Sequence, residues 1–515
     1  MEKETAQISI TSNSKRIAKN TMMLYFRMIL TMLVSLYTSR IILMVLGVED
    51  YGINNVVGGV VTMFAFFNTA LSSATQRFLS FEIGKNNFVQ LRKTFNVALI
   101  IHIGIAIFVL ILAETIGLWF VKTYLVIPEE RMEAALWVYH FSVLSFLISI
   151  IQVPYNATII SHERMNVYAY LSILEVCLKL FIVFMIATIS FDKLKLYGLL
   201  HFSVVFMIAL IFIMYTRKHF KESKLMMVTD KQLYQTIFSF SLWNLLGSIA
   251  VIMKGQGVNI LLNLFYGPVV NAARAIAYQV QGVLYGFVQN FQIALKPQII
   301  KSYAGNDMKY MYQLIFQGTK FSYYLLFGLS FPVILEPEII LSLWLKSVPE
   351  YSVIFLQLVL IDILVESTAG PLVASAHASG KIKLYQTVIG ILFLLNLPIS
   401  YFCLRRGYQP EVTMYISIII TILALFSRII MVSNLVGFSK KDYLKKVLLP
   451  IISVTVASII PPLLIQHYFE AGNERFFVVI ISFIFAFISA VYVIGVNRIE
   501  KDFIRNKILS YIKKH

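Results

Sequence analysis

The chain has 515 residues, of which 58% are hydrophobic and only 14% charged, and its formal net charge is +18. This composition excludes an ordinary soluble domain, and a mean hydropathy of +0.78 indicates a membrane protein. The positive charge is better explained by loops that face anionic lipid than by nucleic-acid binding.

Apolar runs of about 20 residues, the length that crosses a bilayer, follow one another along the whole chain. The first six are predicted at residues 20–46, 53–83, 94–121, 136–154, 167–189 and 196–215. The rest are predicted at 233–264, 269–297, 311–335, 354–378, 384–404, 412–432, 447–467 and 476–496. The sequence therefore predicts an all-α polytopic membrane protein with about 14 transmembrane helices.

The sequence repeats itself at long spacing. Pro154 pairs with Pro371 at a spacing of 217 residues, and Gly47 pairs with Gly267 at a spacing of 220. We expect two six-helix lobes in the same orientation, around a central cationic cavity. The predicted domains are an N-terminal lobe at 1–217, a cytoplasmic linker at 218–232, a second lobe at 233–433, and a C-terminal helix pair with a basic tail at 434–515.

Charged loop residues give the orientation. Lysine and arginine gather in alternate loops, for example Arg217 and Lys218, whereas the opposite loops carry acids such as Glu129 and Glu130. Cytoplasmic loops carry the excess of basic residues. We therefore expect both termini in the cytoplasm and a multi-pass protein of the bacterial inner membrane.

The eighth predicted span carries a polar stripe. Its members recur every three or four residues, which places them on one face of a helix. They are Asn271, Arg274, Tyr278, Gln281, Tyr285, Gln289, Gln292 and Lys296. An ordinary amphipathic surface helix has the same pattern, but at membrane depth such side chains must face protein or water.

Basic side chains gather on spans one, two, seven and eight, whose membrane portions hold no acid. They are Arg27, Arg40, Arg77, Lys254, Arg274 and Lys296. Each isolated base at mid-membrane costs about 2.5–3.5 kcal/mol, so a compensating anion is expected. We predict that Arg27, Lys254 and Arg274 face a ligand; the other three lie near span ends, where extension to the interface is an open alternative.

Residue chemistry points to the cargo. Guanidinium and ammonium groups bind phosphate oxygens, amides bind hydroxyl groups, and tyrosine rings offer faces to sugars. A groove with these groups suits a pyrophosphate attached to sugars.

The stretch LGVEDYGINNVVGGVV followed by SSATQRFLSFEIGKNN resembles the N-terminal region of Wzx-type O-antigen and polysaccharide flippases. These belong to the multidrug/oligosaccharidyl-lipid/polysaccharide (MOP) exporter superfamily, which also contains the MATE drug exporters. The resemblance implies a MATE-like fold and alternating access. It further implies export of an undecaprenyl-pyrophosphate-linked oligosaccharide to the outer leaflet, for O-antigen, capsule or another glycan, with polymerases and glycosyltransferases as partners.

Two acids raise the question of ion coupling. Asp362 and Glu366 lie four residues apart on span ten. They could share a proton or hold Na⁺, or each could pair with a base of a neighbouring span. We expect no metal site, because the histidines lack ligand spacing, and no cofactor.

Two other functions compete. A MATE-like cation-coupled multidrug antiporter should place acids in the cavity, where this chain places bases. A membrane-bound glycosyltransferase or polymerase normally needs a sizeable extramembrane loop, and no predicted loop exceeds about twenty residues. We therefore expect a transporter rather than an enzyme.

Overall fold

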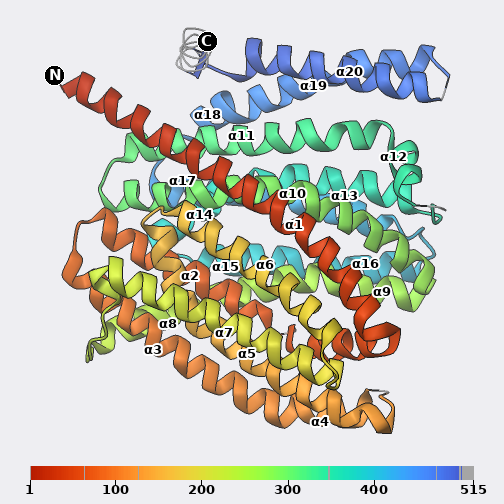
Figure 1. Cartoon of the computed structure of the whole chain (residues 1–515). Coiled ribbons are helices and arrows are strands. Elements are labelled where there is room, and N and C mark those ends of the chain that lie inside the picture. The colour runs from red at the N-terminus through yellow and green to blue at the C-terminus, as the bar shows by residue number, and fades with distance from the viewer. Residues whose placement is uncertain are drawn as a thin grey trace, which may run out of the picture. The chain divides into compact units, whose positions relative to one another are not determined.

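The structure is a computed structural model that describes residues 2–62, 64–125, 127–345, 348–470, 472–497 and 500–501. Every regular element among these residues is a helix (Figure 1). The predicted basic tail, from residue 502 onward, lies outside the described residues. The all-helical class predicted from the sequence is confirmed.

The chain divides into two compact units, and unit 1 comprises Met1–Ile249, Ile293–Met308 and Ile382–Gln386. It holds α1 (Glu2–Thr62), α2 (Ala65–Gly84), α3 (Phe88–Leu112), the π-helical turn η1 (Ala113–Gly117), α4 (Leu118–Tyr124), α5 (Glu129–Ser161), α6 (Met165–Thr188), α7 (Lys193–His219), the 3-10 turn η2 (Lys221–Ser223) and most of α8 (Lys231–Ile252). The start of α8 belongs to this unit because its apolar side chains pack against α2 and α3.

Unit 2 comprises Ala250–Gln292, Lys309–Lys381 and Thr387–His515. It holds the π-helical turn η3 (Met253–Gly257), α9 (Val258–Tyr266), most of α11 (Met308–Leu335), α12 (Pro337–Trp344), α13 (Ser352–Ser367), α14 (Ala369–Ser379), most of α15 (Lys383–Leu394), α16 (Asn396–Arg405), α17 (Val412–Val436), α18 (Lys440–Tyr443), η4 (Leu444–Leu448), α19 (Leu449–Tyr468), α20 (Asn473–Ala490) and η5 (Val491–Gly495). One helix, α10 (Pro268–Ala304), is shared: its residues up to Gln292 belong to unit 2 and the rest to unit 1.

Length and hydropathy identify the helices that can cross a membrane. Among the described residues, 11 helices qualify, and up to 13 if each of two bent helix pairs counts as one span. All of these coincide with predicted spans. The remaining predicted span, 269–297, is α10, which is 37 residues long but is excluded by its polar stripe.

Left-handed backbone positions recur at the repeat spacing. Gly47, inside α1, has a φ of 80°, and Gly267, just after α9, has a φ of 77°. Asn86 and Asn306, with φ angles of 54° and 59°, follow α2 and α10 at the same spacing of 220 residues. Glycine and asparagine are the residues that enter this region most readily. The two halves of the chain therefore turn at matching places.

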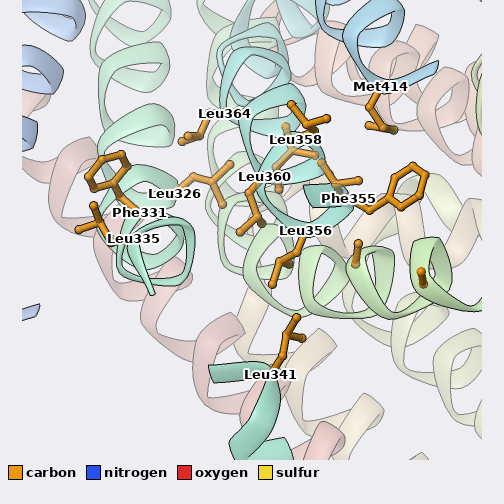
Figure 2. Close-up of a cluster of buried hydrophobic side chains, with 14 of the residues drawn as sticks. Leu326, Phe331, Leu335, Leu341, Phe355, Leu356, Leu358, Leu360, Leu364 and Met414 are labelled. Carbon is orange, nitrogen blue, oxygen red and sulfur yellow. The ribbon is translucent and has the colours of Figure 1, made fainter. Parts of the chain in front are cut away.

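The core of unit 2 is a dense cluster of aliphatic and aromatic side chains (Figure 2). Leu326 and Phe331 of α11 lie near Leu360 and Leu364 of α13 in this cluster, and all four are less than 9% exposed. In a bilayer the lipid is as apolar as these side chains, so close van der Waals packing holds the helices together. Phe483 belongs to the same cluster, which anchors the C-terminal helix pair to unit 2.

In unit 1 a charged clamp fixes the start of α5. The Arg131 guanidinium donates to Oδ1 of Asp50 at 2.9 Å and to Oδ2 of Asp192 at 2.6 Å. Burial of Asp192 would raise its pKa, but the hydrogen bonds from Arg131 and from the backbone N–H of Lys195 hold the pKa below its ordinary value. The clamp ties α1, α5 and the α6–α7 connection at one end of the unit.

Candidate functional site

A polar cavity of about 520 Å³ lies within unit 1. It is bounded by α2, α5 and the last part of α10. Its lining residues are Asn68, Thr69, Ser72, Ser73, Gln76, Ser149, Gln152, Val153, Asn156 and Lys296. Nine of these ten side chains are polar, and none is a carboxylate.

Helical periodicity explains how these side chains meet. On α2, Asn68, Ser72 and Gln76 are spaced four residues apart and therefore share one face. On α5, Ser149, Gln152 and Asn156 follow the same rule. Each helix turns one polar face to the cavity and leaves its apolar residues for the packing against other helices.

Lys296 is the one charged residue among those that line the cavity. Its Nζ donates to Oγ of Ser73 at 2.7 Å. An ammonium group has three N–H donors, so this contact uses one of them. The cavity is therefore cationic as well as rich in neutral hydrogen-bonding groups.

The amides and hydroxyls around Lys296 are partly engaged with one another. Nδ2 of Asn68 donates to Oγ of Ser149 at 2.9 Å, and Nε2 of Gln76 donates to Oγ of Ser72 at 3.0 Å. The Oδ1 atoms of Asn68 and Asn156 are buried and find no hydrogen-bond donor among the described residues. Buried polar atoms are normally paired, so these carbonyl oxygens are acceptors that a bound hydroxyl or water would satisfy.

Lys254, predicted to face a ligand, lies in unit 2 beside a carboxylate. Its Nζ is 3.3 Å from Oδ2 of Asp362 and donates to Oγ1 of Thr421 at 2.8 Å. Thr421 in turn donates to the other carboxylate oxygen of Asp362 at 2.6 Å. We expected the anion that compensates Lys254 to come from the cargo; in the structure the chain itself supplies it.

Arg274 is also in unit 2, but its partners are neutral. It donates to Oδ1 of Asn259 at 2.7 Å, to the carbonyl of Gly255 at 3.2 Å and to the hydroxyl of Tyr278 at 3.0 Å. The π-helical turn η3 presents Gly255, so this turn helps to hold the guanidinium in place. Arg274 is only 5% exposed, and none of these three partners is an anion.

The other predicted bases lie apart from the cavity lining. Arg27 is half-buried, with its guanidinium 4.7 Å from the ring centre of Tyr168 and 3.5 Å from Oγ of Ser172. Arg77 is buried, and its guanidinium lies 4.4 Å from the ring centre of Phe78. Arg40 is exposed. The six predicted bases are therefore distributed over several environments in both units.

The remaining stripe residues of α10 differ in their surroundings. Gln292 donates to Oγ of Ser322 at 3.2 Å and to the carbonyl of Ser367 at 2.9 Å, which binds α10 to α11 and α13. Asn271, Gln281 and Tyr285 are half-buried, and Gln289 is exposed. The stripe thus combines residues that hold helices together with residues that remain accessible.

The second predicted coupling acid is also ion-paired. Oε2 of Glu366 lies 2.7 Å from an NH group of Arg428 on α17. Asp362 and Glu366 are therefore both paired with a base of another helix, Lys254 and Arg428 respectively. This pairing is the alternative to ion coupling that the sequence left open. Among the described residues, no group of three or more His, Cys, Asp or Glu side chains could hold a metal ion.

Span four contributes residues that we did not predict. The candidate site residues predicted from the sequence lie on spans one, two, seven, eight and ten, but α5 supplies Ser149, Gln152 and Asn156 to the cavity lining. Their spacing of three and four residues was a signal present in the sequence. It was obscured because the hydrophobic residues between them dominate any average over the span.

Comparison with known proteins gives the fold. Residues 24–185 match the family model MatE. No curated protein matches the chain. An outward-facing multidrug resistance MATE family transporter of the MOP superfamily is similar over 82% of this chain and 96% of its own, with 12% identity and a TM-score of 0.71.

Two further solved structures are similar. One is a MOP superfamily transporter from Pyrococcus furiosus, for which a binding pocket of reverse polarity is reported to suggest a different function. It has 12% identity and a TM-score of 0.70, and covers 83% of this chain and 97% of its own. A mutant of the Vibrio cholerae MATE transporter VcmN has 16% identity and a TM-score of 0.63, with 83% and 98% covered. The chain is an all-helical, polytopic membrane protein with the fold of the MATE transporters of the MOP superfamily.

Proposed function

We propose that the protein is a flippase for an undecaprenyl-pyrophosphate-linked oligosaccharide, which it moves from the cytoplasmic to the outer leaflet of the bacterial inner membrane by alternating access. The observation that carries this proposal is the cavity of unit 1, whose single charged lining residue is Lys296 and whose lining holds no carboxylate. Such a site suits an anionic head group that carries many hydroxyls.

The chemistry of the cavity fits the two parts of this cargo. The Lys296 ammonium offers charge-assisted hydrogen bonds to phosphate oxygens, which are about twice as strong as neutral ones. Amide and hydroxyl groups of α2 and α5 can donate to and accept from sugar hydroxyls. An organic cation would meet the like charge of Lys296 with no carboxylate in the lining to offset it.

Arg274 extends the proposed cationic path on α10. Its partners are neutral, so its charge is available to an anionic group that reaches η3. Lys254 contributes less to cargo binding in this proposal, because Asp362 already compensates its charge. Arg27 and the accessible amides of α10 remain proposed contacts for the sugars.

Membrane energetics favour export of such a cargo. Each elementary charge that crosses a potential of 100 mV changes the free energy by about 2.3 kcal/mol. The free energy of a dianionic head group therefore falls by about 4.6 kcal/mol when it leaves an inside-negative cell. We propose that the potential alone can give the transport its direction, with proton or Na⁺ coupling as an addition. Glycosyltransferases that build the cargo and a polymerase that consumes it are the proposed partners.

The second candidate is a MATE-like, cation-coupled multidrug antiporter. The comparisons favour this function over the flippase, because the family model is MatE and a structure of the same fold belongs to a multidrug resistance transporter. The buried acid Asp362 would suit ion coupling. Against it stands the polarity of the cavity, and the Pyrococcus furiosus protein is a precedent for a reversed pocket within this fold.

Proteoliposomes distinguish the two functions. Purified protein would be reconstituted with a fluorescent undecaprenyl-pyrophosphate oligosaccharide, and a quencher added outside would measure the exchange of the lipid between leaflets. We expect exchange that depends on the protein, that speeds up under an imposed potential, and that falls about 10- to 100-fold in Lys296→Ala. Absence of exchange, together with uptake of an organic cation such as ethidium against a proton or Na⁺ gradient, would replace the flippase by the antiporter.

A further inference from the structure

The turn between α5 and α6 contains a backbone conformation that is unfavourable for its residue. Glu163 has a φ of 60°, in the left-handed region, where a side chain beyond Cα crowds the following carbonyl oxygen. Residues held in this region tend to occur where the surroundings require the side chain.

The second half of the chain shows which residue occupies the matching turn where no buried carboxylate is needed. Gly380 lies 217 residues after Glu163, which is the spacing of Pro154 and Pro371, and its φ is 75°. At the two other matched left-handed positions both halves of the chain keep one residue type, glycine in one case and asparagine in the other. The glutamate is therefore the exception, and it occupies a position where glycine is conformationally preferred.

The carboxylate of Glu163 explains the exception. Its side chain is only 1% exposed. Its oxygens accept hydrogen bonds from Nε2 of Gln298 at 2.5 Å and Nζ of Lys301 at 2.6 Å, and one of them forms an ion pair with Nε of Arg16 at 2.8 Å. The carbonyl of Glu163 also accepts a bond from Nδ2 of Asn20 at 3.3 Å. One buried acid thus joins the start of the first span of α1, the α5–α6 turn and the last turns of α10.

These contacts lie next to one end of the cavity lining. Lys301 follows the lining residue Lys296 by five residues on α10, or about 7 Å along the axis. Glu163 follows the lining residue Asn156 by seven residues and lies two residues beyond the end of α5. Between the two layers, Oγ of Ser80 donates to Oγ of Ser161 at 3.0 Å, and both serines are fully buried. The three helices that form the cavity are therefore tied together just beyond it.

The packing in this layer is close. A Cβ atom added to Gly84 at the end of α2 would lie 2.7 Å from Cα of Lys301. The absence of a side chain lets the two helices approach until their backbones touch. No bulky side chain separates α2 from α10 here, so the hydrogen bonds to Glu163 act on helices that are already in contact.

We propose that Glu163 is the gating residue at this end of the cavity. Its carboxylate holds α1 and α10 closed over the cavity, and loss of its bonds to Gln298 and Lys301 opens the cavity toward the side of Arg16, which the basic loops predict to be cytoplasmic. The proposal rests on the proposed function in one respect, since a gate presupposes a transporter. It does not depend on which cargo is carried.

A neighbouring acid provides a matched control. Oε1 of Glu222, in η2, lies 2.5 Å from Nε2 of His162, the residue before Glu163. Glu222 is 7% exposed, so it is a buried carboxylate at the same turn. It joins the segment after α7 to the α5–α6 turn and has no contact with α10 among these bonds, so its removal should leave the closure of the cavity unchanged.

The test measures access to the cavity without any cargo. The two native cysteines, Cys177 and Cys403, are replaced by serine, and Thr69→Cys places one thiol in the cavity lining. A membrane-impermeant methanethiosulfonate reagent is applied to vesicles of each orientation. We expect Glu163→Gln to raise the labelling rate from the Arg16 side at least about fivefold, and Lys301→Gln to raise it in the same direction. Glu222→Gln should stay within about twofold of the parent.

A third variant guards against misfolding. Glu163→Gly removes the carboxylate and gives the turn the residue found at its repeat mate, so its backbone is relieved rather than strained. We expect monodisperse protein whose cavity thiol is labelled as fast as in Glu163→Gln. Unchanged labelling in folded Glu163→Gly and Lys301→Gln, or an equal increase in Glu222→Gln, would refute the gate.

A cross-link gives an independent readout that a merely structural role would not affect. Glu163→Cys and Lys301→Cys are combined in the cysteine-free background, with the Thr69→Cys reporter left out, and joined by a short reducible thiol cross-linker. We expect lipid exchange to stop when the link forms and to return when it is reduced. Exchange that persists through the link contradicts the gate. Exchange that is absent before linking, with the labelling results intact, contradicts the proposed cargo and leaves the gate standing.

Discussion

Lys296 and Lys254 are two lysines that the sequence presents in the same way, yet they have opposite surroundings. Lys296 lies in the cavity of unit 1, where its named partner is the neutral hydroxyl of Ser73. Lys254 lies in unit 2 against the carboxylate of Asp362. A buried base with an acid beside it is part of the protein's own structure, whereas a base surrounded by amides and hydroxyls keeps its charge available. The comparison shows that the number of bases on polar stripes does not measure the number of anion-binding groups.

The largest effect should come from breaking the Lys254 pair. The side chains of Lys254 and Asp362 are 16% and 11% exposed, so Asp362→Asn leaves an uncompensated and largely buried ammonium. Removal of one partner of a buried pair costs about 3–5 kcal/mol of stability. We expect a clear drop in the melting temperature in detergent. The double variant Lys254→Met/Asp362→Leu should recover most of the loss, and a double variant as unstable as Asp362→Asn would contradict the pairing.

Lys296→Ala should leave stability nearly unchanged and reduce lipid exchange. A hydrogen bond to a charged group is worth about 1.5–3 kcal/mol, which corresponds to about a 10- to 100-fold loss of exchange rate at low cargo concentration. Lys179→Ala, which removes a lysine paired with Glu175 on α6, serves as the matched control and should have no effect on exchange. If the two alanine variants behave alike, Lys296 does not bind the anionic head group.

Gln76→Glu would make the cavity resemble the surroundings of Lys254. The change keeps the shape of the side chain and places a carboxylate in the lining near Lys296. We expect about a 10-fold loss of exchange of the anionic lipid, because the new charge both repels the phosphates and competes for the ammonium. Uptake of an organic cation should improve in the same variant. Both the anionic lipid and the organic cation would be assayed on one preparation of the variant. Unchanged exchange of the anionic lipid would count against the cavity as the anion site.

Asn156→Ala should have the smallest effect. Its Oδ1 is buried without a partner among the described residues, so its hydrogen bond forms only with a bound molecule. A neutral hydrogen bond contributes about 0.5–1.5 kcal/mol, which predicts about a fivefold weaker apparent affinity for the sugar part. A concentration series of the labelled lipid would measure it. A glycan-free undecaprenyl pyrophosphate should be unaffected, and an equal loss for that lipid would assign Asn156 to the phosphates instead.

The spans were predictable because their signal is local. Whether a run of apolar residues is long enough to cross a bilayer can be read from that run alone, and the period of the polar residues on α10 follows from the geometry of one helix. The break between α1 and α2 was less accessible: we expected one span from 53 to 83, and the structure bends it by 48° between residues 61 and 65. Hydropathy records how apolar a segment is and contains no information about its direction.

The site was predictable only in part because pairing is not local. Asp362 lies 108 residues beyond Lys254, and only helix packing brings the two together. The same holds for Lys296 and Ser73, which are 223 residues apart. Sequence periodicity gave the face of α10 correctly as polar, but which neighbour meets each side chain depends on the packing of α2, α5, α13 and α17. The polar residues of α5 were the exception, since their spacing was readable.

The sharing of α10 between the two units has a mechanical consequence. Pro297 lies inside this helix and has no N–H, so the carbonyl of Ile293, four residues earlier, lacks its helical hydrogen bond. Ile293 is also the residue at which α10 passes from one unit to the other. The helix therefore lacks a hydrogen bond at the residue where it passes from unit 2 to unit 1, and it should bend more easily there than elsewhere along its length. Arg274 precedes Ile293 on α10 and Lys296 follows it. A bend of the helix at this residue would therefore change the direction of one base without moving the other within its own unit.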